Sequence, residues 1–163
     1  MPVTRGKQFE ERFKQDWVRT FPNGECVRLP DQVSGYKYTS QNICDFICYN
    51  YPNLFYIECK THKNASIPLD NITQYDRLIE HSGKQGVRSG VVIWLYEKDR
   101  VFYVPASTIK KMKEDGKKSI GLTSFDEYDI IDLPSRKLRV FMETDYSCMM
   151  NLKEGEWHEQ RKI

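Results

Sequence analysis

The chain has 163 residues, of which 39% are hydrophobic and 13% aromatic, and this apolar content excludes a disordered chain. Its 25 Lys and Arg residues nearly balance 23 Asp and Glu residues, and the resulting net charge of +2 excludes a global polycation. An anionic partner would therefore have to meet a local basic patch. The length suits one compact domain, which we expect over residues 1–150, with a C-terminal tail over residues 151–163.

The five cysteines form no Cys-x-x-Cys pair and the three histidines are scattered, so the sequence predicts neither a disulfide framework nor a zinc finger. The first ten residues already carry Arg5, Lys7 and Glu10, and the longest apolar run, residues 91–96, is short. We therefore expect no secretory signal and no membrane span. The cysteines are expected to be small buried hydrophobic residues in a reducing cytosol.

In chain order, the first predicted element is a helix over residues 7–21, where aromatic residues recur at every fourth position before a Pro-Asn-Gly sequence. A short strand is expected at residues 25–29. The polar and aromatic stretch 30–41 predicts a loop or a projecting hairpin. Two apolar-rich runs, 43–49 and 54–60, flank the turn sequence Asn-Tyr-Pro-Asn and predict an antiparallel hairpin.

The rest of the chain shows a second amphipathic helix, two strands around a charged turn, a short Lys-rich helix and two weaker strand candidates. These elements are expected, in that order, at residues 68–82, 91–96, 100–104, 105–115, 130–133 and 138–142. The alternation of helices and strands predicts an α/β fold in which a mixed β-sheet is flanked by α-helices.

The predicted hairpin carries three charged residues that would share one face. Side chains alternate along a strand, so Glu58 and Lys60 point to the same side. A two-residue reversal at 51–52 would place Asp45 directly opposite Glu58, with Cβ atoms about 5 Å apart. Proline at the second central position suits only a cis turn, so a longer loop with a shifted register is the alternative.

Two carboxylates at that distance repel each other unless a cation lies between them, and hard oxygen ligands suit magnesium or manganese. Lys60 beside them could neutralise a bound phosphate or orient an attacking water, as metal-assisted phosphodiester hydrolysis requires. The Glu-x-Lys pattern is also common as a solvated ion pair on a strand. The apolar residues around these charges favour the metal site, because an unpaired buried carboxylate would be costly.

A fourth candidate for this site is Glu10, which borders the buried stripe of the first helix. From there its carboxylate would lie near the sheet and could reach a metal ion. The alternative, which we weigh equally, is that Glu10 simply favours the positive N-terminal end of the helix.

Three groups of basic or aromatic residues are candidates for DNA contact. Aromatic and basic residues in segment 30–41 could stack on exposed bases, or belong to an ordinary surface hairpin. Lysines between residues 105 and 121 outnumber the acids by three and could contact phosphates, or line a solvated helix face. A loose basic set on the first helix lies beside the expected site. The DNA-binding candidates from these groups are Lys7, Arg12, Tyr36, Lys37, Tyr38, Lys117 and Lys118.

Several short motifs together resemble one known family, the RecU-type Holliday junction resolvases of the PD-(D/E)xK nuclease superfamily. The motifs are GKQFE at 6–10, CDF at 44–46, IECKT at 57–61, SIPL at 66–69 with NI at 71–72, and KSI at 118–120. The resemblance implies a restriction-endonuclease-like fold, a homodimer and magnesium-dependent, symmetric nicking of four-way DNA junctions. It also implies products with a 5′-phosphate and a 3′-hydroxyl, and a place in the cytoplasm of a bacterial cell or a phage-infected host.

By position, the resemblance makes Asp45 and Glu58 metal-binding carboxylates, Lys60 the catalytic lysine and Glu10 the acidic residue of the first helix. Gln74 corresponds to a glutamine of the second helix but falls about two residues early, where an ordinary solvated glutamine is equally consistent. The family's stalk would fall between the first strand and the hairpin, an interval that is short here. The alternative functions are a related nuclease acting on duplex or flap DNA, and a non-catalytic DNA-binding module of the same fold.

Overall fold

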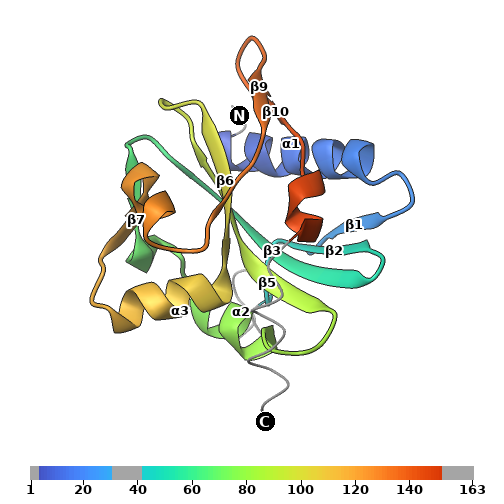
Figure 1. Cartoon of the computed structure of the whole chain (residues 1–163). Helices are drawn as coiled ribbons and strands as arrows, with labels where there is room; N and C mark the ends of the chain where they lie inside the picture. Colours follow the sequence, from blue (N-terminus) through green and yellow to red (C-terminus); the bar gives the residue numbers. More distant parts are fainter. Residues whose placement is uncertain (1–3, 31–41, 152–163) are drawn as a thin grey trace, which may run out of the picture.

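A computed structural model describes residues 4–30 and 42–151 of the chain, and within these ranges a mixed sheet lies between helices (Figure 1). The helices are α1 (Arg5–Thr20), α2 (Tyr75–His81), α3 (Ala106–Glu114) and the 3-10 helices η1 (Leu69–Asn71), η2 (Leu122–Asp126) and η3 (Ser147–Asn151). The strands are β1 (Glu25–Arg28), β2 (Phe46–Asn50), β3 (Asn53–His62), β4 (Ser66–Pro68), β5 (Val87–Leu95), β6 (Arg100–Pro105), β7 (Ser119–Gly121), β8 (Ile131–Asp132), β9 (Ser135–Lys137) and β10 (Met142–Thr144).

Within the described part of the chain, the main sheet has six strands in the order β1-β2-β3-β5-β6-β8. β3 and β5 are parallel, whereas the other neighbouring strands are antiparallel. The crossover from β3 to β5 carries β4, η1 and α2. Two small sheets, β4–β7 and β9–β10, lie outside the main sheet. The predicted α/β architecture, a mixed sheet flanked by helices, is confirmed.

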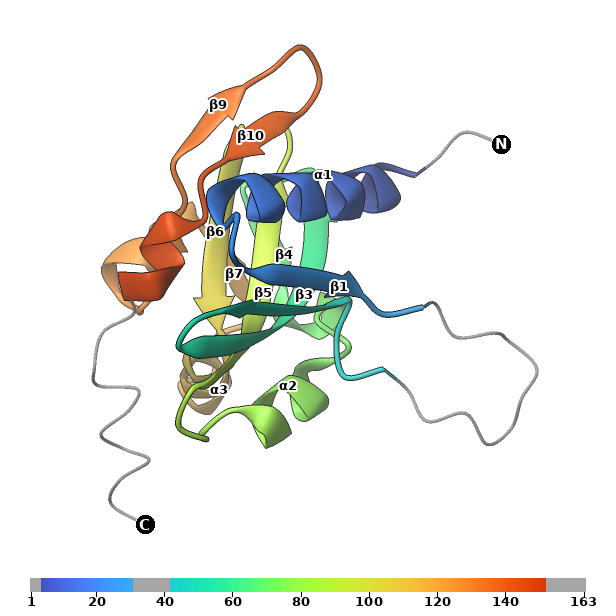
Figure 2. The same cartoon turned by 90° about the vertical axis from the view of Figure 1, so that its right-hand side faces the viewer.

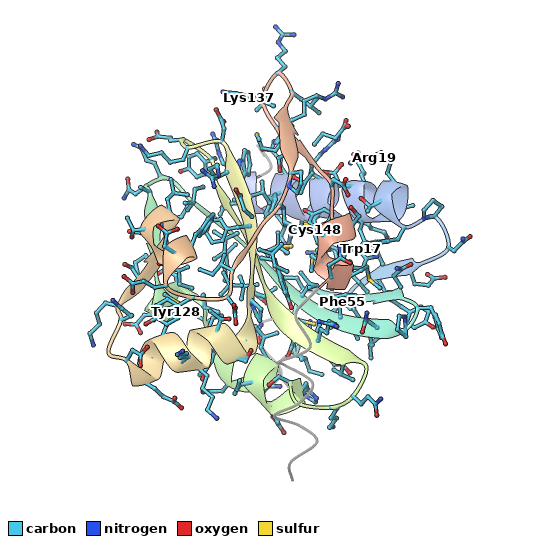
Figure 3. The ribbon with its side chains drawn as sticks, in the orientation of Figure 1. Trp17, Arg19, Phe55, Tyr128, Lys137 and Cys148 are labelled. Atoms are coloured by element: carbon cyan, nitrogen blue, oxygen red, sulfur yellow. The ribbon has the colours of Figure 1, made fainter. Side chains whose placement is uncertain are left out.

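Helices cover both faces of the main sheet: α1 lies across one face, and α2 and α3 pack on the other (Figure 2). α1 begins after Thr4, whose hydroxyl accepts a hydrogen bond from the backbone N–H of Lys7 at 3.3 Å. The aromatic stripe of α1 then packs on the sheet, with the rings of Trp17 and Phe55 5.2 Å apart (Figure 3). This apolar layer fixes α1 over β3, the strand that carries the candidate site.

The β2–β3 hairpin has the predicted two-residue reversal. Asn50 pairs with Asn53 and Phe46 with Ile57, so the predicted register is confirmed. The peptide bond between Tyr51 and Pro52 is cis, the turn conformation that the sequence required for this register.

Three predicted elements differ from the structure. The helix expected at 68–82 is wrong over its first half, because residues 66–68 form β4, which pairs with β7, and α2 begins only at Tyr75. The strand expected at 138–142 is wrong over residues 138–141, which form the turn between β9 and β10, and only Met142 lies in β10. β5 begins four residues before the expected start, because its polar residues are buried: Arg88 donates to Asn53 Oδ1 at 3.1 Å and Ser89 to the Leu78 carbonyl at 2.6 Å.

Within the described ranges, none of the helices has the length and apolar character of a membrane span. The division into a domain over residues 1–150 and a tail over residues 151–163 stays a prediction, since most of the tail lies outside the described residues.

Candidate active site

Asp45 stands directly before β2 and is held by hydrogen bonds to strands on both sides. Its backbone carbonyl accepts from the N–H of Leu29 at 2.8 Å, and its own N–H donates to the Ile57 carbonyl at 3.1 Å. Its side chain reaches across β3, where Oδ2 accepts from the N–H of Cys59 at 2.9 Å. The carboxylate is therefore fixed by a backbone contact beside Glu58, and within residues 4–30 and 42–151 its Oδ1 has no hydrogen-bond partner.

Glu58 lies in the middle of β3 and is only 3% exposed. Burial, and next the charge of Asp45, raise the pKa of the Glu58 carboxyl to about 8. Oε1 lies 3.4 Å from Nζ of Lys60, whereas Oε2 is buried with no hydrogen-bond partner among the described residues. A buried carboxylate oxygen without a partner is costly, so this atom is a candidate ligand for a cation.

The pKa of Asp45 is also raised, first by burial and then by the nearby charge of Glu10. Lys60 and Arg28 act in the opposite direction and lower it. Two buried acids with raised pKa values, one of them raised in part by the charge of the other, lie beside a lysine and form the kind of charge cluster that occurs at functional sites.

Lys60 completes this group on the same face of β3 as Glu58, because the two residues are paired with Val91 and Ile93 of β5 on one side of the sheet. Its side chain is 27% exposed, so its amine can meet a ligand from solvent while it stays paired with Glu58. The predicted grouping of Asp45, Glu58 and Lys60 on one side of the hairpin is what the structure has.

Glu10 is buried on α1 and faces β1. Its Oε2 lies 3.4 Å from a guanidinium nitrogen of Arg28 and 3.6 Å from Nζ of Lys7. It stands in the second turn of α1, whereas the helix-dipole effect is strongest in the first turn. Glu10 thus borders the acidic pair and raises the pKa of both carboxyls, while its own carboxylate contacts the cations Lys7 and Arg28.

The donor set can be compared with what a metal ion needs. Among the described residues, no group of three or more His, Cys, Asp and Glu side chains is arranged to hold a metal ion. Magnesium, however, is commonly held by one or two carboxylates, with waters and substrate phosphates completing its shell. Asp45 Oδ1 and Glu58 Oε2 are two such oxygens, and a cation bound to them would offset the burial and the neighbouring negative charges that raise their pKa values. The residues fit such an ion.

The other predicted site residues lie in different surroundings. Gln74 occupies the N-cap position of α2, and its side-chain oxygen is buried without a partner among the described residues, so within these residues no hydrogen bond of this oxygen joins it to the acidic pair. Arg12 forms ion pairs with Asp16 and Glu143. Lys117 pairs with Glu127 at 3.2 Å, and Lys118 is exposed at the start of β7. Tyr36, Lys37 and Tyr38 lie outside the described residues.

Sequence reasoning missed two contributors to the site. Arg28, the last residue of β1, contacts Glu10 and lowers the pKa of Asp45. The backbone N–H of Cys59 fixes the Asp45 carboxylate. Neither has a motif of its own, although the predicted register, carried one strand further to β1, would have brought Arg28 next to this end of the hairpin.

Comparison with solved structures identifies the class of fold. The chain is similar to Hjc, a Holliday junction resolvase from the archaeal hyperthermophile Archaeoglobus fulgidus, with a TM-score of 0.56. The two share 16% sequence identity, and the match covers 76% of this chain and 93% of that chain. The expected restriction-endonuclease-like fold is confirmed by this neighbour. Comparison with curated protein sequences gives no match.

A family model described as Recombination protein U, RecU, matches residues 28–146. The chain therefore belongs to the RecU family. Its members are Holliday junction resolvases, which are endonucleases that bind branched DNA and in general depend on a divalent metal ion. The matched range contains Asp45, Glu58 and Lys60, whereas Glu10 precedes it.

Proposed function

We propose that this chain resolves four-way DNA junctions by paired symmetric nicks, as a homodimer that uses Mg²⁺ bound by Asp45 and Glu58. The observation that carries the proposal is the buried pair of acids, each with one oxygen engaged by the protein and one left over, beside a partly exposed lysine. Family membership supports the substrate class, and the hard carboxylate oxygens favour Mg²⁺, with Mn²⁺ as a possible substitute.

In the proposed reaction, a water oxygen forms a bond to phosphorus while the bond from phosphorus to the 3′-oxygen breaks. The leaving oxygen takes up a proton, so the products are a 3′-hydroxyl and a 5′-phosphate. A bound divalent ion supplies charge neutralisation and lowers the pKa of a water. Lys60 lies at the exposed side of the acids, where its ammonium group is placed to offset charge on the phosphate and to orient the water.

Glu10 is proposed as the third acidic member of the site, which acts through its contact with Arg28 or directly on the metal ion. Gln74 is proposed to accept a hydrogen bond from the attacking water, since its buried side-chain oxygen has no partner among the described residues. Around the site, the basic and aromatic candidates are proposed to hold the DNA: Lys7, Arg12, Tyr36, Lys37, Tyr38, Lys117 and Lys118.

The first prediction tests the site. Asp45→Asn and Lys60→Ala are each expected to reduce cleavage of a labelled four-way junction in Mg²⁺ by at least about 100-fold, because each removes charge at the reacting phosphate. Junction binding should persist in both variants. Cleavage and binding are measured on four-way, duplex and single-stranded DNA, with Mg²⁺ and with a chelator.

Two matched controls keep this test specific. Asp70→Asn and Lys63→Ala make the same changes at exposed positions on η1 and just after β3, and they are expected to cleave like the wild type. Undiminished cleavage by Asp45→Asn or Lys60→Ala would refute the site. Equal cutting of duplex and junction would favour a nuclease without junction preference, and binding without any cutting would favour a non-catalytic module.

A further inference from the structure

The hairpin formed by β9 and β10 projects from the body of the molecule, away from the main sheet (Figures 1 and 2). Its two strands pair only with each other among the described elements. The Leu138 N–H donates to the Phe141 carbonyl at 2.7 Å and closes a tight turn. Arg139 and Val140 therefore occupy the tip, and Val140 is 58% exposed.

The base of this hairpin is fixed to the rest of the protein. The backbone N–H of Thr144 donates to Asp16 Oδ2 at 3.0 Å, and Arg19 donates to the Thr144 carbonyl at 2.9 Å. Phe141 packs near Trp94, with ring centroids 6.2 Å apart. A projecting element with an anchored base presents its tip in one arrangement, which lowers the entropy cost of binding.

The outward-facing charge of the hairpin is positive. Arg136 pairs with Glu143 at 3.2 Å and Lys137 with Asp99 at 3.1 Å, but the cations are 72% and 60% exposed and their acids only 30% and 40%. Exposed pairs of this kind contribute less than about 1 kcal/mol, so a stronger anion can replace the acid. Arg139 has no ion pair with any residue in the described ranges.

α1 extends this positive surface. Arg12 and Arg19 approach Glu143 at 3.6 and 3.9 Å, so one carboxylate is shared by the guanidinium groups of both and of Arg136. Figure 3 shows Lys137 on the hairpin and Arg19 on the neighbouring α1. The patch consists of Arg12, Arg19, Arg136, Lys137 and Arg139 with the acids Asp16, Asp99, Glu143 and Asp145. Five cations and four acids leave a local charge of +1, and the cations of the hairpin are its most exposed members.

We infer that the β9–β10 hairpin grips a duplex arm of the DNA, with its cations on phosphates and Val140 against the sugar edge of a groove. Cations in DNA-binding proteins contact phosphates and position the protein, and an aliphatic side chain among them is typical of a contact inside a groove. The inference rests on the proposed function, because it places this duplex arm on a substrate that the chain cleaves elsewhere.

The second prediction concerns the salt dependence of junction binding. Arg139→Gln should weaken binding about threefold and lower the slope of log K against log salt by about 0.9, since one phosphate contact is lost. The triple change Arg136→Gln, Lys137→Gln, Arg139→Gln should weaken binding about tenfold or more. Val140→Ser should weaken binding without a change of slope. Binding is measured on a four-way junction and on a duplex at several salt concentrations.

Lys84→Gln is the matched control, because Lys84 is an exposed cation just after α2, and α2 lies at the opposite end of the molecule from the β9–β10 hairpin in Figure 1. A wild-type affinity and slope for Arg139→Gln, or an equal effect of Lys84→Gln, would overturn the inference while wild-type cleavage upholds the proposed function. A wild-type chain that neither binds nor cuts junctions would reject both. Circular dichroism confirms that each exposed substitution leaves the fold intact.

Discussion

At the scale of single residues, the site combines a strongly buried acid with a neighbouring acid and a lysine. The pKa of Glu58 is raised to about 8 by burial and by Asp45, so the folded protein binds this proton more tightly than the unfolded chain. Without a metal ion, this contribution to stability is fully present below the ordinary glutamate pKa and is lost as the pH rises through about 8. The raised pKa of Asp45 acts in the same direction.

The third prediction follows from this loss of stability with rising pH. In chelator, the free energy of unfolding of the wild type should fall between pH 5 and pH 8 relative to that of Glu58→Gln, because each tenfold difference in proton affinity is worth about 1.4 kcal/mol. Urea unfolding at several pH values measures it. Glu80→Gln, an exposed acid on α2, is expected to follow the wild type. If the free energy of unfolding of the wild type changed with pH in parallel with that of Glu58→Gln, the raised pKa of Glu58 would be contradicted.

A related outcome separates metal binding from simple burial. At pH 8, added Mg²⁺ should raise the melting temperature of the wild type but not that of Glu58→Gln, since a ligand that binds only the folded state stabilises it. Equal shifts in both proteins would remove Glu58 from the metal site.

The sequence could predict the three central residues because their grouping depends on local geometry. Asp45, Glu58 and Lys60 belong to one hairpin, and strand alternation with a short turn is enough to bring them together. Arg28 and Glu10 come from β1 and α1, whose packing on the hairpin depends on contacts distant in the sequence. The helix pattern could therefore name Glu10 only as a candidate of equal weight with its alternative, and Arg28 was missed.

At the scale of elements, α1 is joined to β10 by a buried carboxylate. Asp16 is 1% exposed and contacts Arg12 at 3.0 Å, Arg19 at 2.7 Å and the backbone N–H of Thr144 at 3.0 Å. This cluster holds the helix that carries Glu10 against the element that carries the projecting hairpin. Removal of the acid would leave two guanidinium groups facing each other and one buried N–H without a partner.

The fourth prediction is that Asp16→Ala lowers the free energy of unfolding by about 1–3 kcal/mol, the usual cost of leaving a buried N–H without a partner, because Arg12 and Arg19 stay partly exposed to solvent. Asp16→Asn keeps an acceptor for the Thr144 N–H and should lose less. Denaturant unfolding measures both, with Glu11→Ala at the exposed neighbouring position as the control. A loss below about 1 kcal/mol for Asp16→Ala would show that the cluster does not hold α1.

The elements differ in how well the sequence predicts them. α1 and the β2–β3 hairpin have strong periodicity or a tight turn, and both were predicted closely. The start of the helix expected from residue 68 was predicted wrongly. Ser66–Pro68 form β4 and pair with β7, more than fifty residues away in the sequence, and this tertiary pairing overrides the local helical preference. The start of β5 was missed because Arg88 and Ser89 are polar residues satisfied by distant partners.

At the scale of the whole molecule, a four-way junction has two strands to cut, and one chain provides one candidate site. Paired symmetric nicks therefore require two copies of the chain, related by a two-fold axis that matches the symmetry of the junction. This requirement is the basis on which we propose a homodimer.

The fifth prediction tests that arrangement on a plasmid that extrudes a cruciform. The wild type should give mainly linear product, because both strands are cut within the lifetime of one complex. Wild type mixed with an excess of Asp45→Asn should give mainly nicked circles, since a mixed dimer cuts one strand. Wild type diluted with the Asp70→Asn control should still give linear product. Linear product in the presence of excess Asp45→Asn, or a monomer by light scattering, would refute the paired sites.

The short turn between β2 and β3 has a further consequence for how sequences of this kind can change. The two acids are brought together by the number of residues between them, and neighbouring positions on a strand face opposite sides. An insertion or deletion of one residue in this reversal would shift one partner to the apolar side under α1, even with every proposed site residue retained. Surface loops tolerate changes of length far better, so we expect the spacing in this hairpin, as much as the identity of its acids, to decide whether a related sequence can form the proposed site.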